Sequence, residues 1–523
     1  MYAAELILVM LIAVAALVTI ARYLGIVYPI FLLAGGLALG FVPWIPRIEI
    51  DPDVIFLLVL PPLLYIAGFF TAPRSLRANL GTISSLAVAL VIATAAAVAV
   101  VTRVLIPDIT WPLAFVLGAI VAPPDAIAAA AIADRLAIPR RVVTILEGES
   151  LLNDATALTL YSIALATAMG GPFSGSMAVI VFAGALLGGG AIGAAVGWVI
   201  VQIRKRINDT PVEITISLLT PYAAYLSANR LGASGVIATV VAGLYLGQYR
   251  SRIMGADARL TGRAVWEILT FLLNGFVFIV MGLEVPLLLR SVTSSLAFRL
   301  VGIGLVVCLV LVLVRVLFIF GTVLAPRLIR RRQKIRTLFA SSLVLSWAGM
   351  RGVVSLAAAL ALPMTLGGGG AFPARQALLI VTLTVIVFTL LVQGLTLPEL
   401  IRRLRLGTDV ETHEDETRAR QRLVEAATIR LEQLYPVWPQ HRPLLDQLRE
   451  MYRHRSEHAN PQHHPASVNG EDRDLIEHRE IRRTVIGSER EALVRLHTEG
   501  EISDEVLRNL ERELDLEEQR MDA

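Results

Sequence analysis

Cysteine and charged residues are scarce in this sequence, and each shortage excludes something. There is a single cysteine, Cys308, among 523 residues, so no disulfide can form within the chain. Charged residues make up only 17% of the chain, whereas soluble globular proteins have about a quarter. Hydrophobic residues make up 55%. An ordinary soluble protein of this length is therefore excluded.

Histidine is missing from the first 406 residues, because all eight histidines lie beyond that point. Residues 1–406 carry 30 basic and 16 acidic groups, a net charge of +14, whereas residues 407–523 carry 17 basic and 27 acidic groups, a net charge of −10. This contrast predicts a membrane domain over residues 1–406 and a cytoplasmic, mostly helical tail over residues 407–523. The basic excess lies in short loops, which indicates membrane orientation and no nucleic-acid partner. No ligand is predicted for the tail.

Long apolar runs are abundant, and a membrane-spanning helix needs about 20 such residues. The sequence predicts an all-α, polytopic membrane protein with about thirteen spanning helices, over residues 3–21, 25–43, 54–71, 82–106, 111–133, 140–168, 175–203, 212–229, 233–248, 263–288, 297–324, 336–363 and 376–399. An N-terminus outside the cell places 19 basic residues in inward loops and six in outward loops. The positive-inside rule thus predicts that the N-terminus is outside and the tail is in the cytoplasm, in a multi-pass protein of the cell membrane.

Ionisable residues inside spans are candidates for function, because each costs roughly 2.5–3.5 kcal/mol at the middle of the bilayer. Six such residues are Asp125, Glu147, Glu149, Asp154, Arg315 and Arg351.

The fifth predicted span contains consecutive prolines directly before an acidic residue. Pro123 and Pro124 each remove a backbone donor, which predicts a broken helix. Irregular backbone at membrane depth persists only where it is buried in protein or lines a cavity. Asp125 follows the break, where a half-helix end and freed carbonyls can help to hold a cation. The alternative is a proline kink with a structural acid.

The sixth predicted span carries two polar stripes. At 100° per residue, Ser150 and Asp154 share one stripe, with Glu147 a turn away as a possible entrance to the site. Glu149 and Asn153 form the neighbouring stripe. The first stripe can meet the acid of the fifth span. For Asn153 the alternative is an amide that only packs helices together.

The two arginines within spans need different explanations. Arg351 lies between Gly349 and Gly352, which weaken the twelfth span, and it needs a carboxylate partner. Glu149 is the acid that the first stripe leaves free, so we expect a fixed Glu149–Arg351 ion pair. Arg315 has no obvious partner, and we expect it to reach the inner membrane surface.

Interrupted helices recur at matching positions. If the seventh span is a linker, spans one to six and eight to thirteen form two halves, each broken in its fifth helix. This pattern is typical of transporters built from two inverted repeats, with a site where the broken helices cross.

These residues predict exchange of ions. Because the membrane domain has no histidine, protons at the site must be carried by carboxylates. An aspartate in water, with a pKa near 3.9, is a poor proton carrier at neutral pH, and burial beside a second carboxylate corrects this. A proton or a hard monovalent cation can neutralise such a site. If the charged, empty site cannot reorient in the bilayer, the two ions exchange.

Four motifs in order resemble the monovalent cation:proton antiporter-1 family of Na⁺/H⁺ exchangers. They are Ala122–Ala126 (APPDA), Glu147–Asp154 (EGESLLND), Phe271–Leu283 (FLLNGFVFIVMGL) and Arg351–Pro363 (RGVVSLAAALALP). The resemblance covers roughly residues 1–400. It implies the antiporter fold, in which a core domain moves against a dimerisation domain, and therefore a homodimer. It also implies exchange of Na⁺, with Li⁺ or K⁺ as further candidates, for H⁺ in pH homeostasis, with no cofactor.

The resemblance also implies roles for residues at the motif positions. It makes Asp154 the main ligand for Na⁺ and H⁺, with Asp125, Ser150 and the backbone at Pro124 beside it. Asn153 precedes Asp154, and this Asn-Asp pair implies electroneutral exchange.

The site-stabilising residues implied by the same likeness are Asn153, Glu149 and Arg351. One position departs from the family pattern. Many members have an acidic residue in the third span, where this sequence has Ile66 within Pro61–Gly68 (PPLLYIAG). The choice among Na⁺, K⁺ and Li⁺ is therefore left open.

Two other classes of protein fit parts of the pattern. A cation channel or uniporter would move cations without obligatory proton counterflow. An intramembrane aspartyl protease would also place aspartates in adjacent helices, but it leaves Asn153 without a role. We therefore expect an antiporter and not an enzyme.

Overall fold

The computed structural model describes most of the chain. The described residues are 2–24, 28–42, 55–71, 73–125, 139–207, 209–290, 292–324, 335–365, 372, 374–404, 410–458 and short stretches between 484 and 517. The chain divides into two compact units, Met1–Asp409 and Val410–Ala523. The assignment of residues 407–523 to the cytoplasm remains a prediction.

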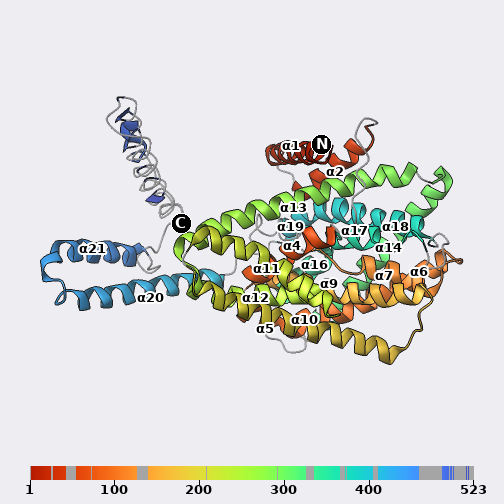
Figure 1. Ribbon diagram of the computed structural model, residues 1–523, viewed down its shortest axis with the longest axis horizontal. Coiled ribbons are helices and arrows are strands. Elements are labelled where there is room, and N and C mark those ends of the chain that lie inside the picture. The colour runs from red at the N-terminus through yellow and green to blue at the C-terminus, as the bar shows by residue number, and fades with distance from the viewer. Residues whose placement is uncertain are drawn as a thin grey trace. The chain divides into compact units, whose positions relative to one another are not determined.

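All regular elements in the described residues are helices (Figure 1). In the first unit they are α1 (Tyr2–Tyr23), α2 (Tyr28–Gly40), the π-helix η1 (Ile55–Val59), α4 (Leu60–Phe70), α5 (Pro73–Ser84), the π-helix η2 (Ser85–Leu90), α6 (Val91–Leu105), α7 (Trp111–Val121), α9 (Arg140–Ala168), α10 (Gly175–Arg204), α11 (Thr210–Arg230), α12 (Gly235–Ile253), α13 (Ala256–Arg290), α14 (Ser294–Ile319), the π-helix η3 (Phe320–Leu324), α16 (Ile335–Trp347), α17 (Val353–Leu360), α18 (Arg375–Phe388), the π-helix η4 (Thr389–Gln393) and α19 (Gly394–Leu404). In the second unit they are α20 (Val410–Leu434), the short 3₁₀ helix η5 (Pro439–His441) and α21 (Arg442–His458).

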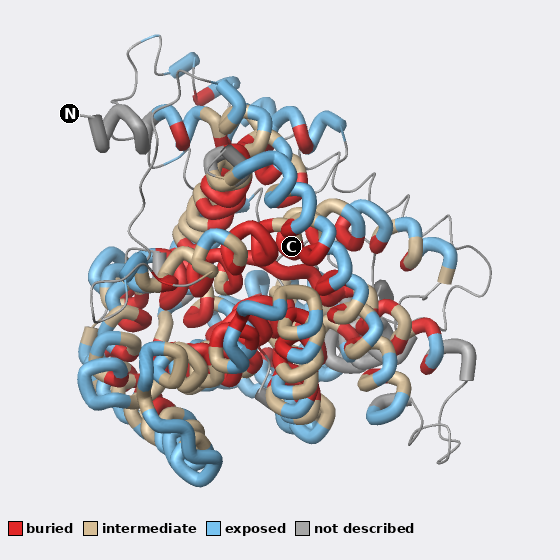
Figure 2. The backbone as a smooth tube through the Cα atoms, turned by 90° about the vertical axis from the view of Figure 1, so that its right-hand side faces the viewer, coloured by how far each residue is buried: buried red, intermediate tan, exposed pale blue. Residues whose placement is uncertain are grey.

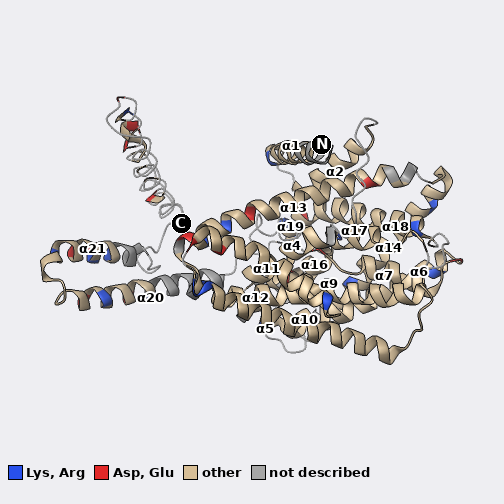
Figure 3. Cartoon of the chain, in the orientation of Figure 1, with Lys and Arg blue, Asp and Glu red and all other residues tan. Residues whose placement is uncertain are grey.

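The helices of the first unit agree with an integral membrane protein. Five helical stretches are long and apolar enough to cross a membrane, namely Ser75–Leu105, Gly175–Arg204, Asp257–Pro286, Ser294–Thr322 and Arg375–Leu404. Five shorter apolar helices accompany them among the described residues. Charged residues lie mostly near the ends of the helices (Figure 3). Every predicted span contains helical residues, but the number of crossings and the inverted repeat remain predictions.

The interruption predicted in the twelfth span is confirmed. Helix α16 ends at Trp347 and α17 begins at Val353, with non-helical backbone between them. In the fifth span, α7 ends at Val121, directly before the segment Ala122–Asp125. The remainder of that predicted span, residues 126–133, lies outside the described residues.

Helices of the first unit approach each other closely at contacts where the residue is glycine, which has no side chain. A Cβ atom at Gly36 of α2 would collide with the carbonyl of Ile279 in α13, and one at Gly282 of α13 would collide with the carbonyl of Leu33. Close packing of this kind is how helices associate in lipid, where the hydrophobic effect does not drive them together. Buried residues gather in the interior of this unit (Figure 2).

Large apolar side chains also cover the outside of the first unit. In α10, for example, Val179, Leu187 and Trp198 are exposed. Such surfaces are unusual for a protein in water and suit a lipid environment.

Candidate functional site

The non-helical segment Ala122–Asp125 at the end of α7, called the first break below, meets the break between α16 and α17 inside the first unit. The backbone N–H of Asp125, the last residue of the first break, donates to the carbonyl of Met350, in the break between α16 and α17, at 2.7 Å. The Oδ2 atom of Asp125 accepts a hydrogen bond from the N–H of Val353 at 3.2 Å. Val353 is the first residue of α17, so the carboxylate lies at the positive end of a helix. Two of the backbone groups at the break between α16 and α17, the carbonyl of Met350 and the N–H of Val353, thus form hydrogen bonds with Asp125.

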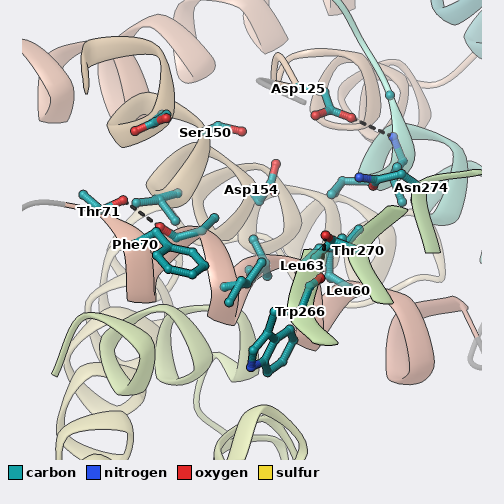
Figure 4. A pocket seen from close by; sticks show the side chains of 18 of the residues that line it. Leu60, Leu63, Phe70, Thr71, Asp125, Ser150, Asp154, Trp266, Thr270 and Asn274 are labelled. Carbon is teal, nitrogen blue, oxygen red and sulfur yellow. Dashed lines mark hydrogen bonds between the residues drawn. The ribbon is translucent and has the colours of Figure 1, made fainter. Parts of the chain in front are cut away.

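A cavity of about 590 Å³ lies at this crossing. Its walls include Pro123, Pro124 and Asp125 from the first break and Ser150 and Asp154 from α9. Figure 4 shows the side chain of Asp154 directed toward the space that Ser150 and Asp125 also border. The structure therefore brings together the four residues that the sequence suggested for ion binding.

Glu147 and Ile66 line the same cavity. Glu147 is half-buried and lies in α9, two turns before Asp154. The side chain of Ile66 gives the cavity wall an apolar surface at the position where many members of the antiporter family named above have an acidic residue. The wall that α4 contributes at Ile66 thus offers no carboxylate oxygen.

Asn153 forms a hydrogen bond with the backbone of the first break. Its side chain is fully buried, and Nδ2 donates to the carbonyl of Pro124 at 2.8 Å. A carboxylate at position 153 could not donate this bond. The amide therefore holds the backbone directly before Asp125.

The predicted Glu149–Arg351 ion pair is wrong, and so is the expectation for Arg315. Nη1 and Nη2 of Arg315 donate to the two carboxylate oxygens of Glu149 at 2.5 and 2.8 Å, and their side chains are 3% and 1% exposed. Nε of Arg315 also donates to the carbonyl of Leu345 in α16, at 3.0 Å. Arg315 therefore does not reach the membrane surface. It joins α14, α9 and α16 in the interior.

Arg351 is buried and serves backbone carbonyls. Its Nε donates to the carbonyl of Val121 at 3.0 Å, and Nη1 donates to the carbonyl of Gly349. Its own N–H donates to Oγ1 of Thr389 at 3.1 Å. One side chain thus connects the last residue of α7 to the break between α16 and α17.

Apart from Ser150, sequence reasoning missed the uncharged polar residues of the cavity. Thr71, Trp266, Thr270, Asn274 and Ser355 line it, as do the charged residues Arg250, Arg263 and Glu267. Uncharged polar residues are common in membrane helices, so their presence in the sequence does not mark a binding site. Only their position on the same cavity wall as the aspartates makes them candidates. Helix α13 begins at Ala256, earlier than the predicted span 263–288, and Arg263 within it lines the cavity.

Replacing Gly352 with alanine tests the crossing directly. A Cβ atom at Gly352 would collide with the carboxylate of Asp125. We expect Gly352→Ala to displace that carboxylate and to lower ion exchange about tenfold or more, with folded protein retained. Gly302→Ala in α14 is the matched control, because a Cβ atom there meets nothing within 4 Å. Proteoliposome flux and gel-filtration profiles of both variants provide the measurement, and unchanged flux in Gly352→Ala would contradict the described geometry.

The family model for the transmembrane part of sodium/hydrogen exchangers matches residues 9–403. The chain belongs to the sodium/hydrogen exchanger family. An uncharacterized Na⁺/H⁺ exchanger of Mycobacterium tuberculosis is 36% identical, with 98% of this chain and 95% of that protein covered. A sodium, potassium, lithium and rubidium/H⁺ antiporter of Bacillus subtilis is 31% identical over 75% of this chain and 60% of its own length.

Solved structures share the fold of the exchanger. A sodium proton antiporter of Methanocaldococcus jannaschii aligns with a TM-score of 0.59 at 20% identity, covering 78% of this chain and all of that chain. The family match makes the exchanger an integral membrane protein of a family of cation/proton transporters, not of enzymes, and its regular elements are helices throughout the described residues.

Proposed function

We propose that this exchanger moves Na⁺ in one direction and H⁺ in the other across the cell membrane, with Li⁺ and K⁺ as further substrates. The carrying observation is that Asp125 and Asp154 line one cavity where the end of α7 meets the break between α16 and α17. Carboxylate oxygens are suitable ligands for hard cations and can also take up a proton. The range of cations in the name of the Bacillus subtilis relative supports the inclusion of Li⁺ and K⁺.

The arginines within the fold support this assignment. Arg315 is engaged by Glu149, and Arg351 is engaged by backbone carbonyls. Their positive charges are therefore committed to the scaffold. Neither of these two arginines is available to neutralise Asp154, and we infer that an ion from solution does so.

Competition at Asp154 produces antiport. Asp154 is 6% exposed, and a bare carboxylate in such a place is costly to move through the bilayer. The site reorients when either a cation or a proton neutralises it, so that each transport cycle couples one to the other by alternating access. Asp125, Ser150 and the backbone at Pro124 complete the site with Asp154, and all four residues line the cavity. Glu147 serves as the entrance on the same cavity.

The exchange is electroneutral in this proposal. Asn153 cannot titrate, and its amide is engaged by the carbonyl of Pro124. One carboxylate, Asp154, then changes its occupant in each cycle, so one cation exchanges for one proton. The protein works as a homodimer, with its N-terminus outside and residues 407–523 in the cytoplasm.

Coupling and charge balance can be measured in proteoliposomes. We expect addition of Na⁺, Li⁺ or K⁺ to release protons from an acid-loaded lumen, at an initial rate that does not change when the membrane potential is set by ionophores. The apparent KM for Na⁺ should rise as the external pH falls, because protons compete for Asp154. Cation uptake without proton release would contradict antiport, and a rate that follows the membrane potential would contradict electroneutrality.

A further inference from the structure

Two uncharged side chains of the cavity have oxygen atoms without a hydrogen-bond partner among the described residues. They are Oδ1 of Asn274, in the middle of α13, and Oγ of Ser355, in the first turn of α17. The two residues are 7% and 2% exposed. Both line the cavity that holds Asp125 and Asp154.

Two other hydroxyl groups on the same walls, those of Thr270 and Thr71, are satisfied within their own helices. Thr270 donates to the carbonyl of Trp266 at 2.7 Å, and Thr71 donates to the carbonyl of Ala67 at 2.7 Å. Buried polar atoms in proteins are almost always paired, and leaving one unpaired is costly. The unpaired oxygens of Asn274 and Ser355 therefore call for a partner, whereas the hydroxyl of Thr270 already has one.

The surroundings of each oxygen favour a cation as the missing partner. Ser355 lies two residues after Val353, whose N–H binds the carboxylate of Asp125, so α17 keeps the hydroxyl and this carboxylate at a fixed spacing. Asn274 lies beside the hydroxyl of Tyr28, to which its amide nitrogen can donate. The carbonyl oxygen of Asn274 then remains for a positively charged ligand. Figure 4 shows Asn274 and Asp125 on the same side of the cavity.

We propose that the cation held by Asp125 and Asp154 takes further oxygen ligands from Asn274 and Ser355, and that these two residues set the affinity and selectivity for cations. The proposal rests on the function proposed above. It also accounts for Ile66, which gives the cavity a hydrocarbon surface on α4. Neutral oxygens from α13 and α17 supply ligands without adding a further titrating charge to those of Asp125 and Asp154, so the one-for-one exchange is preserved.

Single substitutions test the assignment in proteoliposomes with Na⁺, Li⁺ and K⁺. We expect Asn274→Leu and Ser355→Ala each to raise the KM for Na⁺ about tenfold, equivalent to about 1.4 kcal/mol. The maximal rate should stay within about twofold, and the ratios of KM among the three cations should change. Asn274→Gln and Ser355→Thr, which keep an oxygen, should restore part of the affinity. Stabilisation of the purified exchanger by Na⁺ against heating should weaken in parallel.

Thr270→Val is the matched control on the cavity wall, because its hydroxyl is already bonded to its own helix. Its KM values should equal those of the wild type. Unchanged KM values in Asn274→Leu and Ser355→Ala, in a wild-type background that exchanges and that Asp154→Asn inactivates, would overturn this proposal and leave the proposed function intact. An equal loss of rate for all cations with unchanged KM ratios would also overturn it, since a purely structural role predicts that pattern. Absence of exchange in the wild type would overturn both.

Discussion

Replacing Asp154 with asparagine is expected to abolish cation-driven proton movement. Asparagine keeps the size of the side chain and removes both the negative charge and the titrating group. The site can then no longer bind a cation and a proton in alternation. We expect the exchange rate to fall at least about a hundredfold, because the charge that offsets the dehydration of a cation at membrane depth is lost. The measurement is the rate of luminal pH change in proteoliposomes after addition of Na⁺.

Asp108→Asn is the control for this substitution. Asp108 is exposed and lies between α6 and α7, so the same chemical change there leaves the cavity untouched. Its exchange rate should equal that of the wild type. If Asp154→Asn exchanges at full rate, Asp154 does not carry the ions. If Asp108→Asn is as inactive as Asp154→Asn, the loss in the latter does not report on the cavity.

Much of the arrangement around Asp154 could be predicted because it depends on local chemistry. Proline removes a backbone donor wherever it stands, so the sequence before Asp125 predicts a break, and the structure ends α7 at Val121. Glycine weakens a helix locally, and α16 ends two residues before Gly349. Helical periodicity places Ser150 and Asp154 on one stripe, and both line the cavity.

The partner of Glu149 could not be predicted in the same way. Helical periodicity gives the direction of a side chain around its own axis, but not the identity of the helix that faces it. The sequence pattern pairs Glu149 with Arg351 and leaves Arg315 without a partner, although either guanidinium can bind a carboxylate. Glu149 is 166 residues away from Arg315 in the sequence. The choice is made by the packing of α14 against α16, which brings Arg315 within reach of Glu149 in α9.

Uncharged ligands escape sequence reasoning for a different reason. A charged residue inside a membrane span is costly, so its presence already suggests a function. An asparagine or a serine costs less and is common in helix contacts. Asn274 and Ser355 become candidates only when their unpaired oxygens are found on the wall that Asp154 shares.

The ion pair of Arg315 and Glu149 predicts the second large effect, on stability. Removing one partner leaves a buried charge without compensation, which costs about 3–5 kcal/mol. This is a large fraction of the roughly 5–15 kcal/mol by which domains are stable. We therefore expect Arg315→Leu and Glu149→Leu each to abolish or greatly reduce the yield of folded exchanger, measured by fluorescence-detected gel filtration of detergent extracts after heating.

The double variant separates the cost of an unpaired charge from the loss of a helix contact. With both side chains apolar, no buried charge remains, so the Arg315→Leu/Glu149→Leu protein should be more heat-resistant than either single variant. Arg403→Ala is the control, because it breaks an exposed pair with Glu399 (2.8 Å; side chains 78% and 52% exposed) that contributes less than about 1 kcal/mol. Additive losses in the double variant would show that Arg315 and Glu149 act independently. The expected recovery instead identifies their pairing as the link that fixes α9, and with it Asp154, against α14 and α16.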